Sequence, residues 1–153
     1  MNRMRKVLIA DDEIKVGQLV KRLIQWDQLG LTCIGLVTDG QTAYEKILSE
    51  SPDIVITDIR MPVLTGLEMI QKASEQGVKC HFIVVSGYKY FDYAQKALKY
   101  GVEDYLLKPI DEDELNRQLQ KIVAEEEQRE DKQQQVNQIE KKLEDSKYLR
   151  HKE

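Results

Sequence analysis

The sequence predicts a doubly wound α/β fold built on a five-stranded parallel sheet. Short apolar runs alternate along the chain with segments of helical periodicity, which is the pattern of repeated strand–helix units. Strands joined by helices in this way run parallel, so their C-terminal ends meet at one edge of the sheet. Charged or hydroxyl side chains end or follow four of these runs. Because ligands bind at that edge in open parallel sheets, a functional site is expected there.

Five apolar runs define the strands. They are expected at Lys6–Ala10, Leu31–Val37, Asp53–Thr57, Cys80–Val85 and Val102–Leu107. Helices are expected at about 14–26, from Gly40 onward, after Thr65, near 90–100 and from Asp111 onward. In each helix, apolar residues recur three or four positions apart, which marks the face that packs on the sheet. The residues expected to face inward are Val16, Leu19, Val20, Leu23, Ala43, Ile47, Leu48, Leu67, Ile70, Ala73, Phe91, Ala94 and Leu98.

The composition changes sharply near residue 110. Residues 1–110 hold 14 acidic and 14 basic residues, whereas residues 111–153 hold 13 acidic and 9 basic residues and no glycine or proline. The formal net charge of −4 therefore belongs to the C-terminal part. We expect a globular domain over residues 1–125 and a helical linker over residues 126–153. Neither part is basic enough to hold a nucleic-acid backbone by itself.

The chain has two cysteines, and no apolar run approaches the roughly 20 residues that span a bilayer. Cys33 and Cys80 lie in predicted strands, and we expect them to be buried thiols rather than a disulfide. The N-terminal residues do not have the pattern of a secretory signal. These features predict a reducing, cytoplasmic setting and no membrane contact.

Three carboxylates are expected at the C-terminal edge of the sheet. Asp11 and Asp12 follow the first strand, and Asp58 follows the third. Acids brought together repel one another unless a cation lies between them, and hard carboxylate oxygens favour Mg²⁺ over zinc. The alternative is that these acids cap helices or lie in solvent. That alternative suits Asp11 alone better than it suits the whole set.

A cation and a hydroxyl are expected at the same edge. Lys108 follows the fifth strand and Ser86 follows the fourth. A carboxylate beside a metal and a lysine can act as a nucleophile toward a phosphoryl group, whose transfer needs chiefly positioning and charge neutralisation. Ser86 could donate a hydrogen bond to a phosphoryl oxygen, or it could cap a strand–helix junction. Pro109 makes a cis bond after Lys108 accessible, which would hold the lysine on a rigid backbone.

Several segments in order form a specific combination of motifs. They are Asp11-Asp12-Glu13, Pro52-Asp-Ile-Val-Ile-Thr-Asp58-Ile-Arg-Met-Pro62, Gly66-Leu-Glu68, Ser86-Gly-Tyr88 and Gly101-Val-Glu-Asp-Tyr-Leu-Leu-Lys-Pro109. Over about residues 3–125 the chain resembles the receiver domain of two-component response regulators. The resemblance implies a flavodoxin-like sheet with the strand order 2-1-3-4-5. The wording around Arg60 and Ser86 is similar to receivers of the YesN-like group, which usually precede an AraC-type DNA-binding domain.

The resemblance implies a metal-assisted phosphoacceptor site. Asp58 would accept a phosphoryl group from a histidine of a sensor kinase. Asp12, Asp58 and the backbone carbonyl of Arg60 would bind Mg²⁺ directly, and Asp11 would hold the ion through water. The residue types and their order match the family at each of these four positions.

The resemblance also implies a conformational switch. Lys108 and Ser86 would bind the transferred phosphoryl group, and Tyr105 would be an aromatic switch whose rotamer follows Ser86. From its position alone, Tyr105 is an ordinary half-buried tyrosine of a strand. Thr65 stands where the family usually has an acidic residue before Gly66, and threonine can still cap a helix there.

The function expected from this resemblance is phosphorylation-controlled regulation of transcription. Phosphorylation of Asp58 would switch the conformation of the domain and so control an output domain that is absent from this chain. DNA would be bound only through that output domain. No enzymatic turnover is expected beyond self-phosphorylation from small donors and slow self-dephosphorylation.

Two other functions stay open. A stand-alone phosphoryl carrier or scaffold would have the same site residues. A Mg²⁺-dependent phosphatase similar to haloacid-dehalogenase-like enzymes would also form an aspartyl phosphate. Those enzymes carry an Asp-x-Asp pair after the first strand, whereas the acids here are adjacent and the candidate nucleophile follows the third strand. The chain also offers no cap domain for a substrate, so the phosphatase is the weaker alternative.

The C-terminal extension predicts a helical connector. It lacks helix breakers and is rich in Glu, Gln, Lys and Arg, which favour helix. Val136, Ile139 and Leu143 form its single apolar patch, which is too short for a strong coiled coil. We therefore expect a weak parallel homodimer that phosphorylation enhances, with a solvated single helix as the alternative. A second candidate interaction face consists of Tyr90, Tyr93 and Tyr100.

Overall fold

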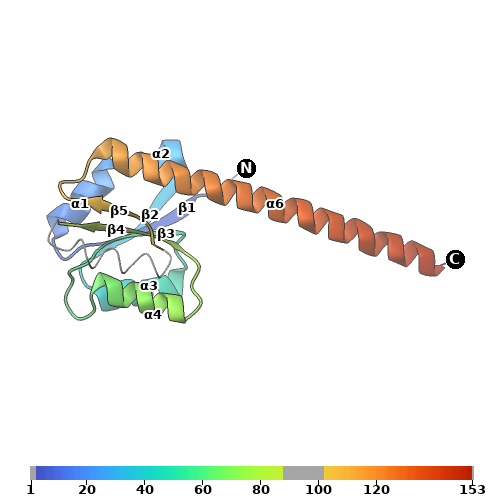
Figure 1. Ribbon diagram of the computed structural model, residues 1–153, viewed down its shortest axis with the longest axis horizontal. Helices are drawn as coiled ribbons and strands as arrows, with labels where there is room; N and C mark the ends of the chain where they lie inside the picture. Colours follow the sequence, from blue (N-terminus) through green and yellow to red (C-terminus); the bar gives the residue numbers. More distant parts are fainter. Residues whose placement is uncertain (1–2, 88–101, 153) are drawn as a thin grey trace. The chain divides into compact units, whose positions relative to one another are not determined.

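A five-stranded sheet forms the centre of the first part of the chain. The computed structural model describes residues 3–87 and 102–152 (Figure 1). The strands are β1 (Arg5–Ala10), β2 (Leu31–Val37), β3 (Ile54–Asp58), β4 (His81–Ser86) and β5 (Val102–Leu107). The helices are α1 (Ile14–Leu23), α2 (Trp26–Leu29), α3 (Gly40–Glu50), α4 (Gly66–Glu75) and α6 (Glu112–Lys152). The helix predicted near 90–100, with its three tyrosines, lies outside the described residues.

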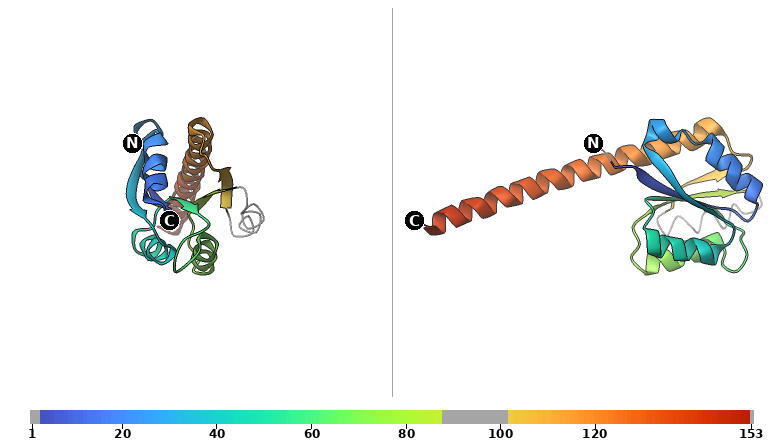
Figure 2. Two further views of the ribbon diagram at one scale, coloured as in Figure 1. Left: turned by 90° about the vertical axis from the view of Figure 1, so that its left-hand side faces the viewer. Right: turned by 180° about the vertical axis from the view of Figure 1, so that it is seen from behind.

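The sheet has the doubly wound order that the sequence predicts. Its strands are arranged β2-β1-β3-β4-β5, and every neighbouring pair runs parallel. Helices α3 and α4 lie on one face of the sheet and α1 lies on the other (Figures 1 and 2). Each predicted strand agrees with the observed one to within one residue at both ends. The C-terminal ends of β1, β3, β4 and β5 therefore share one edge.

The central strands are buried on both faces. Every residue of β3 is buried, as expected for a parallel strand that helices cover on both sides. Val55 of β3 belongs to the apolar core between the sheet and the helices α3 and α4. The helix residues in that core are Ala43, Ile47, Met69, Ile70 and Ala73. Because burying each large aliphatic side chain stabilises the fold by about 1.5–3 kcal/mol, this core holds the end of β3 firmly.

The first helix is shorter than the sequence predicts. The periodicity predicts one helix over residues 14–26, whereas α1 ends at Leu23 and the single turn α2 follows it. Asn116, near the start of α6, stabilises the break between α1 and α2 by two hydrogen bonds. Its Nδ2 donates to the carbonyl oxygen of Leu23 at 2.8 Å, and its Oδ1 accepts from the backbone nitrogen of Gln25 at 2.9 Å. A side chain 91 residues away from Gln25 thus satisfies backbone groups that the break frees.

Two residues predicted to face the sheet are exposed instead. Leu19 of α1 and Leu48 of α3 lie at the surface, next to the buried Val20 and Ile47. Met69 of α4, which the periodicity did not select, is fully buried. Each helix therefore buries a slightly different stripe from the one that the apolar pattern predicts, because the shape of the sheet decides which residues reach it.

The two cysteines are only partly buried, which corrects the expectation of buried thiols. Cys33 lies on the edge strand β2, and Cys80 directly precedes β4. The strands β1 and β3 separate β2 from β4, so the two thiols are free. Burial raises the pKa of the Cys80 thiol to about 12, which keeps it protonated at neutral pH.

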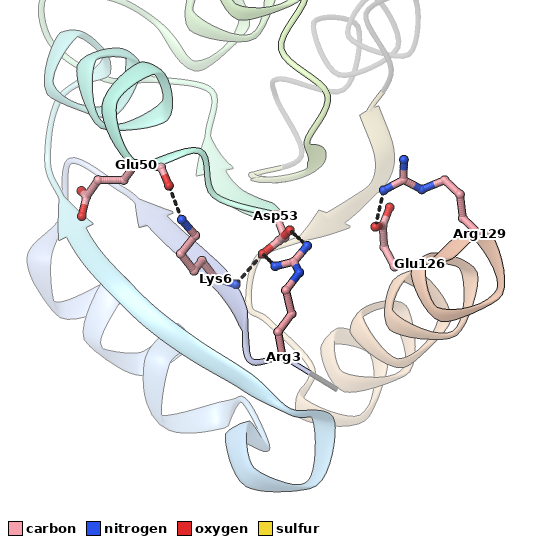
Figure 3. Close-up of polar contacts among 6 residues, drawn as sticks. All are labelled: Arg3, Lys6, Glu50, Asp53, Glu126 and Arg129. Carbon is pink, nitrogen blue, oxygen red and sulfur yellow. Dashed lines mark hydrogen bonds and ion pairs between the residues drawn. The ribbon is translucent and has the colours of Figure 1, made fainter. Parts of the chain in front are cut away.

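Another aspartate, Asp53, lies at the opposite edge of the sheet. Directly before β3, Asp53 accepts hydrogen bonds of 2.7 and 2.9 Å from the Arg3 guanidinium and one of 2.8 Å from the backbone nitrogen of Lys6 (Figure 3). The Lys6 ammonium donates to the carbonyl oxygen of Glu50 at the end of α3. Burial alone would raise the pKa of Asp53, but these hydrogen bonds outweigh it and the pKa is lowered. This ionised carboxylate joins the N-terminus to the start of β3.

The chain divides into two compact units, Met1–Leu119 and Gln120–Glu153. The boundary lies a few residues before the one expected at 125. Helix α6 runs unbroken across it, and its first turns belong to the first unit.

The second unit is a polar helix. Within it, Arg129 donates to Glu126 at 2.7 Å (Figure 3). Among its side chains whose burial the structure describes, up to residue 146, the large exposed apolar ones are Val136, Ile139 and Leu143, which are 46%, 58% and 57% exposed. Among the helices of the described part of the chain, none is both long and apolar enough to cross a membrane.

Candidate functional site

Three carboxylates meet at the C-terminal edge of the sheet, as the sequence predicts. Asp11 directly follows β1, Asp12 is its neighbour, and Asp58 is the last residue of β3. One oxygen from each of the three lies within 4.8 Å of the others. Asp11 and Asp58 are only 3% and 6% exposed, whereas Asp12 is exposed to solvent. The cluster therefore has a buried side and a side open to solvent.

Lys108 supplies a cation on the buried side of this cluster. Its Nζ lies 3.2 Å from Asp58 Oδ2 and 3.3 Å from Asp11 Oδ2. The backbone nitrogen of Lys108 donates to the carbonyl oxygen of Ser86 at 2.9 Å, which ties the end of β5 to the end of β4. The peptide bond between Lys108 and Pro109 is cis.

Burial controls the protonation of the two inner acids. It raises the pKa of Asp11 to about 6, although a hydrogen bond from the backbone nitrogen of Glu13 and the charge of Lys108 oppose this. Burial also raises the pKa of Asp58, against the opposing charge of Lys108. Burial would lower the pKa of Lys108, but the carboxylates of Asp58 and Asp11 outweigh it and raise that pKa. The lysine is therefore charged at neutral pH.

A fixed hydrogen bond orients the Asp58 carboxylate. Its Oδ1 accepts from the backbone nitrogen of Ile59 at 2.7 Å, and its Oδ2 faces Lys108 at 3.2 Å. The two oxygens of the acid therefore have different partners. A carboxylate held in this way is positioned for chemistry at one edge of the sheet rather than free to rotate in solvent.

The predicted hydroxyl and aromatic residues lie on the neighbouring strands. Ser86 ends β4 and is fully buried, and its Oγ donates to the carbonyl oxygen of Gly87 at 3.1 Å. Asp58 pairs in register with Val85, the residue before Ser86. Tyr105 of β5 pairs with Val84, is partly buried and packs against the apolar core. The structure places these residues one and two strands away from Asp58, and their roles in a switch stay predictions.

The loop after β3 contains a strained residue that sequence reasoning missed. Val63 has a φ of 69°, in the left-handed region that β-branched residues avoid, and its side chain is 83% exposed. The backbone nitrogen of Leu64 donates to the Pro62 carbonyl oxygen at 2.7 Å, which closes a tight turn around Val63. Arg60 lies earlier in the same loop with an exposed side chain, and its carbonyl stays a predicted metal ligand. No residue type in this loop predicts the positive φ of Val63.

The donor set fits a hard divalent cation. The cluster offers three carboxylate oxygens, with the exposed Asp12 leaving room for water. Among the described residues no histidine or cysteine joins the cluster, so its chemistry favours Mg²⁺ over zinc. The pKa shifts of Asp11 and Asp58 point the same way, since burial raises both pKa values even with Lys108 beside the two acids, and a further cation would favour their ionised forms.

The family model of the response regulator receiver domain matches residues 7–120. The chain belongs to the response regulator receiver family. The match covers every strand except the first residues of β1, and it includes all the predicted site residues. The family and the fold that the sequence predicts are therefore confirmed, and the roles of the site residues stay predictions.

Relatives of this receiver domain include transcriptional regulators. It is 46% identical over 122 residues to YesN, an uncharacterized transcriptional regulatory protein of Bacillus subtilis, in an alignment that covers 80% of this chain and 33% of YesN. It is 35% identical over 120 residues to the transcriptional regulatory protein HptR of Staphylococcus aureus, covering 78% of this chain and 47% of HptR. The chain thus spans between a third and a half of the length of these curated relatives.

A solved receiver domain has the same fold. The structure of the REC domain of AraT, a response regulator from Geobacillus stearothermophilus, superposes with a TM-score of 0.79 at 36% sequence identity. The superposition covers 83% of this chain and 98% of that one.

Proposed function

We propose that this receiver domain accepts a phosphoryl group on Asp58 from a phosphohistidine of a sensor histidine kinase. The observation that carries the proposal is the position of the Asp58 carboxylate, which is 6% exposed and lies 3.2 Å from the Lys108 ammonium beside two further acids. A carboxylate nucleophile with a fixed cation next to it and metal-binding acids around it suits phosphoryl transfer, which depends mainly on positioning and charge neutralisation.

The reaction forms one bond and breaks one. A carboxylate oxygen of Asp58 bonds to phosphorus while the bond between phosphorus and the kinase imidazole nitrogen breaks. The imidazole leaves with the electron pair of that bond. With acetyl phosphate as the donor, the bond between phosphorus and the acetyl oxygen breaks and acetate leaves. Water later hydrolyses the acyl phosphate, which yields inorganic phosphate and restores the carboxylate.

The surrounding residues have separate roles in the proposed reaction. Asp11, Asp12 and Asp58, with the carbonyl of Arg60, would hold Mg²⁺, in keeping with the metal use of receiver domains. The bound ion supplies neutralisation of the charge on the phosphoryl oxygens. Lys108 supplies a second, permanent cation. The Ser86 hydroxyl would turn from the Gly87 carbonyl to donate to a phosphoryl oxygen.

The phosphorylated state is proposed to act as a signal rather than as a catalytic intermediate. The Ser86 hydroxyl and Tyr105 would change position together, and this change would alter an output domain carried elsewhere in the full-length protein. Relatives named as transcriptional regulators support DNA as the target of that output domain. The domain is not proposed to turn over substrates beyond labelling itself from small donors and losing the group slowly.

The helix of the second unit is proposed to connect the receiver to that output and to pair weakly with a second copy. Val136, Ile139 and Leu143 lie three and four residues apart, as along a coiled-coil seam, and all are exposed. Three apolar residues per chain bury too little area for a stable pair. Phosphorylation would supply the rest of the association energy.

Covalent labelling by acetyl phosphate, followed by intact-mass spectrometry, tests the proposed function. Stoichiometric labelling without continued release of phosphate from small esters supports a receiver or carrier. Continued turnover of such esters would favour the phosphatase alternative.

A further inference from the structure

Thr57 is a buried polar residue in an otherwise apolar strand. It precedes Asp58 in β3, where the other residues before the acid are Ile54, Val55 and Ile56, and it is completely buried. Side chains alternate along a strand, so Thr57 faces the same side as Val55, toward the apolar core under α3 and α4. A valine would fill this position without burying a hydroxyl. The hydroxyl therefore calls for an explanation beyond packing.

The Thr57 hydroxyl holds the backbone of the phosphoacceptor. Its Oγ1 donates to the carbonyl oxygen of Asp58 at 2.9 Å. The next backbone nitrogen, of Ile59, donates to Asp58 Oδ1 at 2.7 Å. The carbonyl of Asp58 and the N–H of Ile59 belong to one peptide group, which is planar. Fixing the oxygen at one end of this plane therefore fixes the direction of the N–H at the other end, and with it the carboxylate.

Gly66 bounds the same carbonyl from another side. A Cβ on Gly66 would lie 2.0 Å from the carbonyl oxygen of Asp58, so only glycine fits at this first residue of α4. The backbone nitrogen of Gly66 donates to the Ile59 carbonyl oxygen at 2.7 Å, and Thr65 caps the helix by accepting from the backbone nitrogen of Glu68. The start of α4 thus packs directly against the peptide group between Asp58 and Ile59. The hydroxyl of Thr57 completes this support from within β3.

We infer that Thr57 is a positioning residue for phosphorylation, which orients the Asp58 carboxylate through the peptide group between Asp58 and Ile59. The inference rests on the proposed function of Asp58. The hydrogen bond of the Thr57 hydroxyl goes to the backbone carbonyl oxygen of Asp58, so Thr57 acts on the carboxylate through the peptide group. Its effect is on the direction in which Asp58 presents its oxygens, and a misdirected nucleophile reacts more slowly even when it is fully ionised.

The test compares Thr57→Val with Thr57→Ser. The first removes the hydroxyl and keeps the shape, and the second keeps the hydroxyl. Labelling rates are measured at saturating Mg²⁺ over a range of acetyl phosphate concentrations. We expect Thr57→Val to lower the limiting rate about tenfold with an unchanged half-saturating donor concentration, and Thr57→Ser to restore it to within about twofold. Thr32→Val, the same substitution on the edge strand β2, is the matched control and should label like wild type.

A second measurement separates this inference from the proposed function. Hydrogen exchange of the Ile59 amide, followed by NMR without any phosphoryl donor, should be faster in Thr57→Val than in wild type and normal in Thr57→Ser. A Thr57→Val protein that labels at the wild-type rate overturns the inference. If wild type takes up no phosphoryl group, the proposed function of Asp58 is wrong, and an Ile59 amide unaffected by Thr57→Val would overturn the positioning as well.

Discussion

The Lys108 ammonium lies 3.2 Å from Asp58 Oδ2, although the two residues are 50 positions apart in the sequence. The same ammonium lies 3.3 Å from Asp11 Oδ2. One cation therefore faces two buried carboxylates, and the third acid of the cluster, Asp12, lies on the exposed side. The site therefore carries an excess of negative charge.

Removing one buried charge should stabilise the metal-free protein. Burial raises the pKa of Asp11 from 3.8 to about 6, so the folded protein binds this proton more tightly than the unfolded chain does. The contribution of Asp11 to stability therefore falls as the pH rises from about 4 to about 6, and the penalty is fully present at pH 7. Asp11→Asn should raise the free energy of unfolding at pH 7 by about 1–2 kcal/mol.

Urea unfolding at two pH values measures this effect. The gain from Asp11→Asn should shrink toward zero near pH 4, where wild-type Asp11 is itself mostly protonated in the folded protein. Asp58→Asn should behave in the same direction, because burial raises the pKa of Asp58 as well. Equal stability of wild type and Asp11→Asn at pH 7 would show that the acid carries no burial penalty.

Mg²⁺ should stabilise wild type and should fail to stabilise Asp12→Ala. At a free Mg²⁺ concentration 100 times the dissociation constant, binding to the folded state alone adds about 2.7 kcal/mol. Asp12 is exposed, so its removal should cost the metal-free protein little. The measurement is the shift in Tm with Mg²⁺, and Glu13→Gln, an exposed acid beside the cluster, is the control. A normal Mg²⁺ shift in Asp12→Ala would remove Asp12 from the metal site.

Asn116 should contribute strongly to stability through the break between α1 and α2. Asn116→Leu leaves the Leu23 carbonyl and the Gln25 N–H without their partner and should lower the free energy of unfolding by about 2–3 kcal/mol. Asn116→Asp can still accept from Gln25 but cannot donate to Leu23, so its loss should be smaller. Trp26, the single tryptophan, starts α2 and reports unfolding by fluorescence. An unchanged stability in Asn116→Leu would mean that the break forms without this side chain.

The break between α1 and α2 is a feature that the sequence alone could not predict. Strand positions could be predicted because buried parallel strands are continuous apolar runs, and the sheet order was implied by the resemblance to receiver domains. The end of α1 could not, because it depends on Asn116 in α6, which is adjacent only in the folded chain. Local periodicity continues past Leu23 and contains no sign of the distant partner.

The site was predictable in its chemistry but not in its supports. Asp11, Asp12, Asp58 and Lys108 could be brought together from strand ends alone, because parallel strands place those ends at one edge. Thr57 and the strained Val63 could not be recognised, since a threonine in a strand and a valine in a loop are ordinary residues. Their importance depends on distances and dihedral angles that only the folded backbone defines.

The C-terminal helix should associate weakly and only with help. Val136, Ile139 and Leu143 are exposed along one side of α6 within the second unit. We expect residues 1–153 to dimerise more after phosphorylation than before, and a chain that ends near Glu125 to dimerise less. Sedimentation equilibrium measures both. Ile139→Gln removes one apolar residue of the patch without shortening the helix, and it should weaken association as the truncation does. Equal association with and without the tail would refute a dimerising role for it.

Phosphorylation of Asp58 is the central claim, and intact-mass spectrometry tests it most directly. Wild type and Asp58→Asn are incubated with acetyl phosphate and Mg²⁺ under identical conditions. A wild-type sample that contains a chelator in place of Mg²⁺ is the control. Wild type should gain one phosphoryl group per chain when Mg²⁺ is present, and Asp58→Asn should gain none. Undiminished labelling of Asp58→Asn would contradict the assignment of the phosphoacceptor.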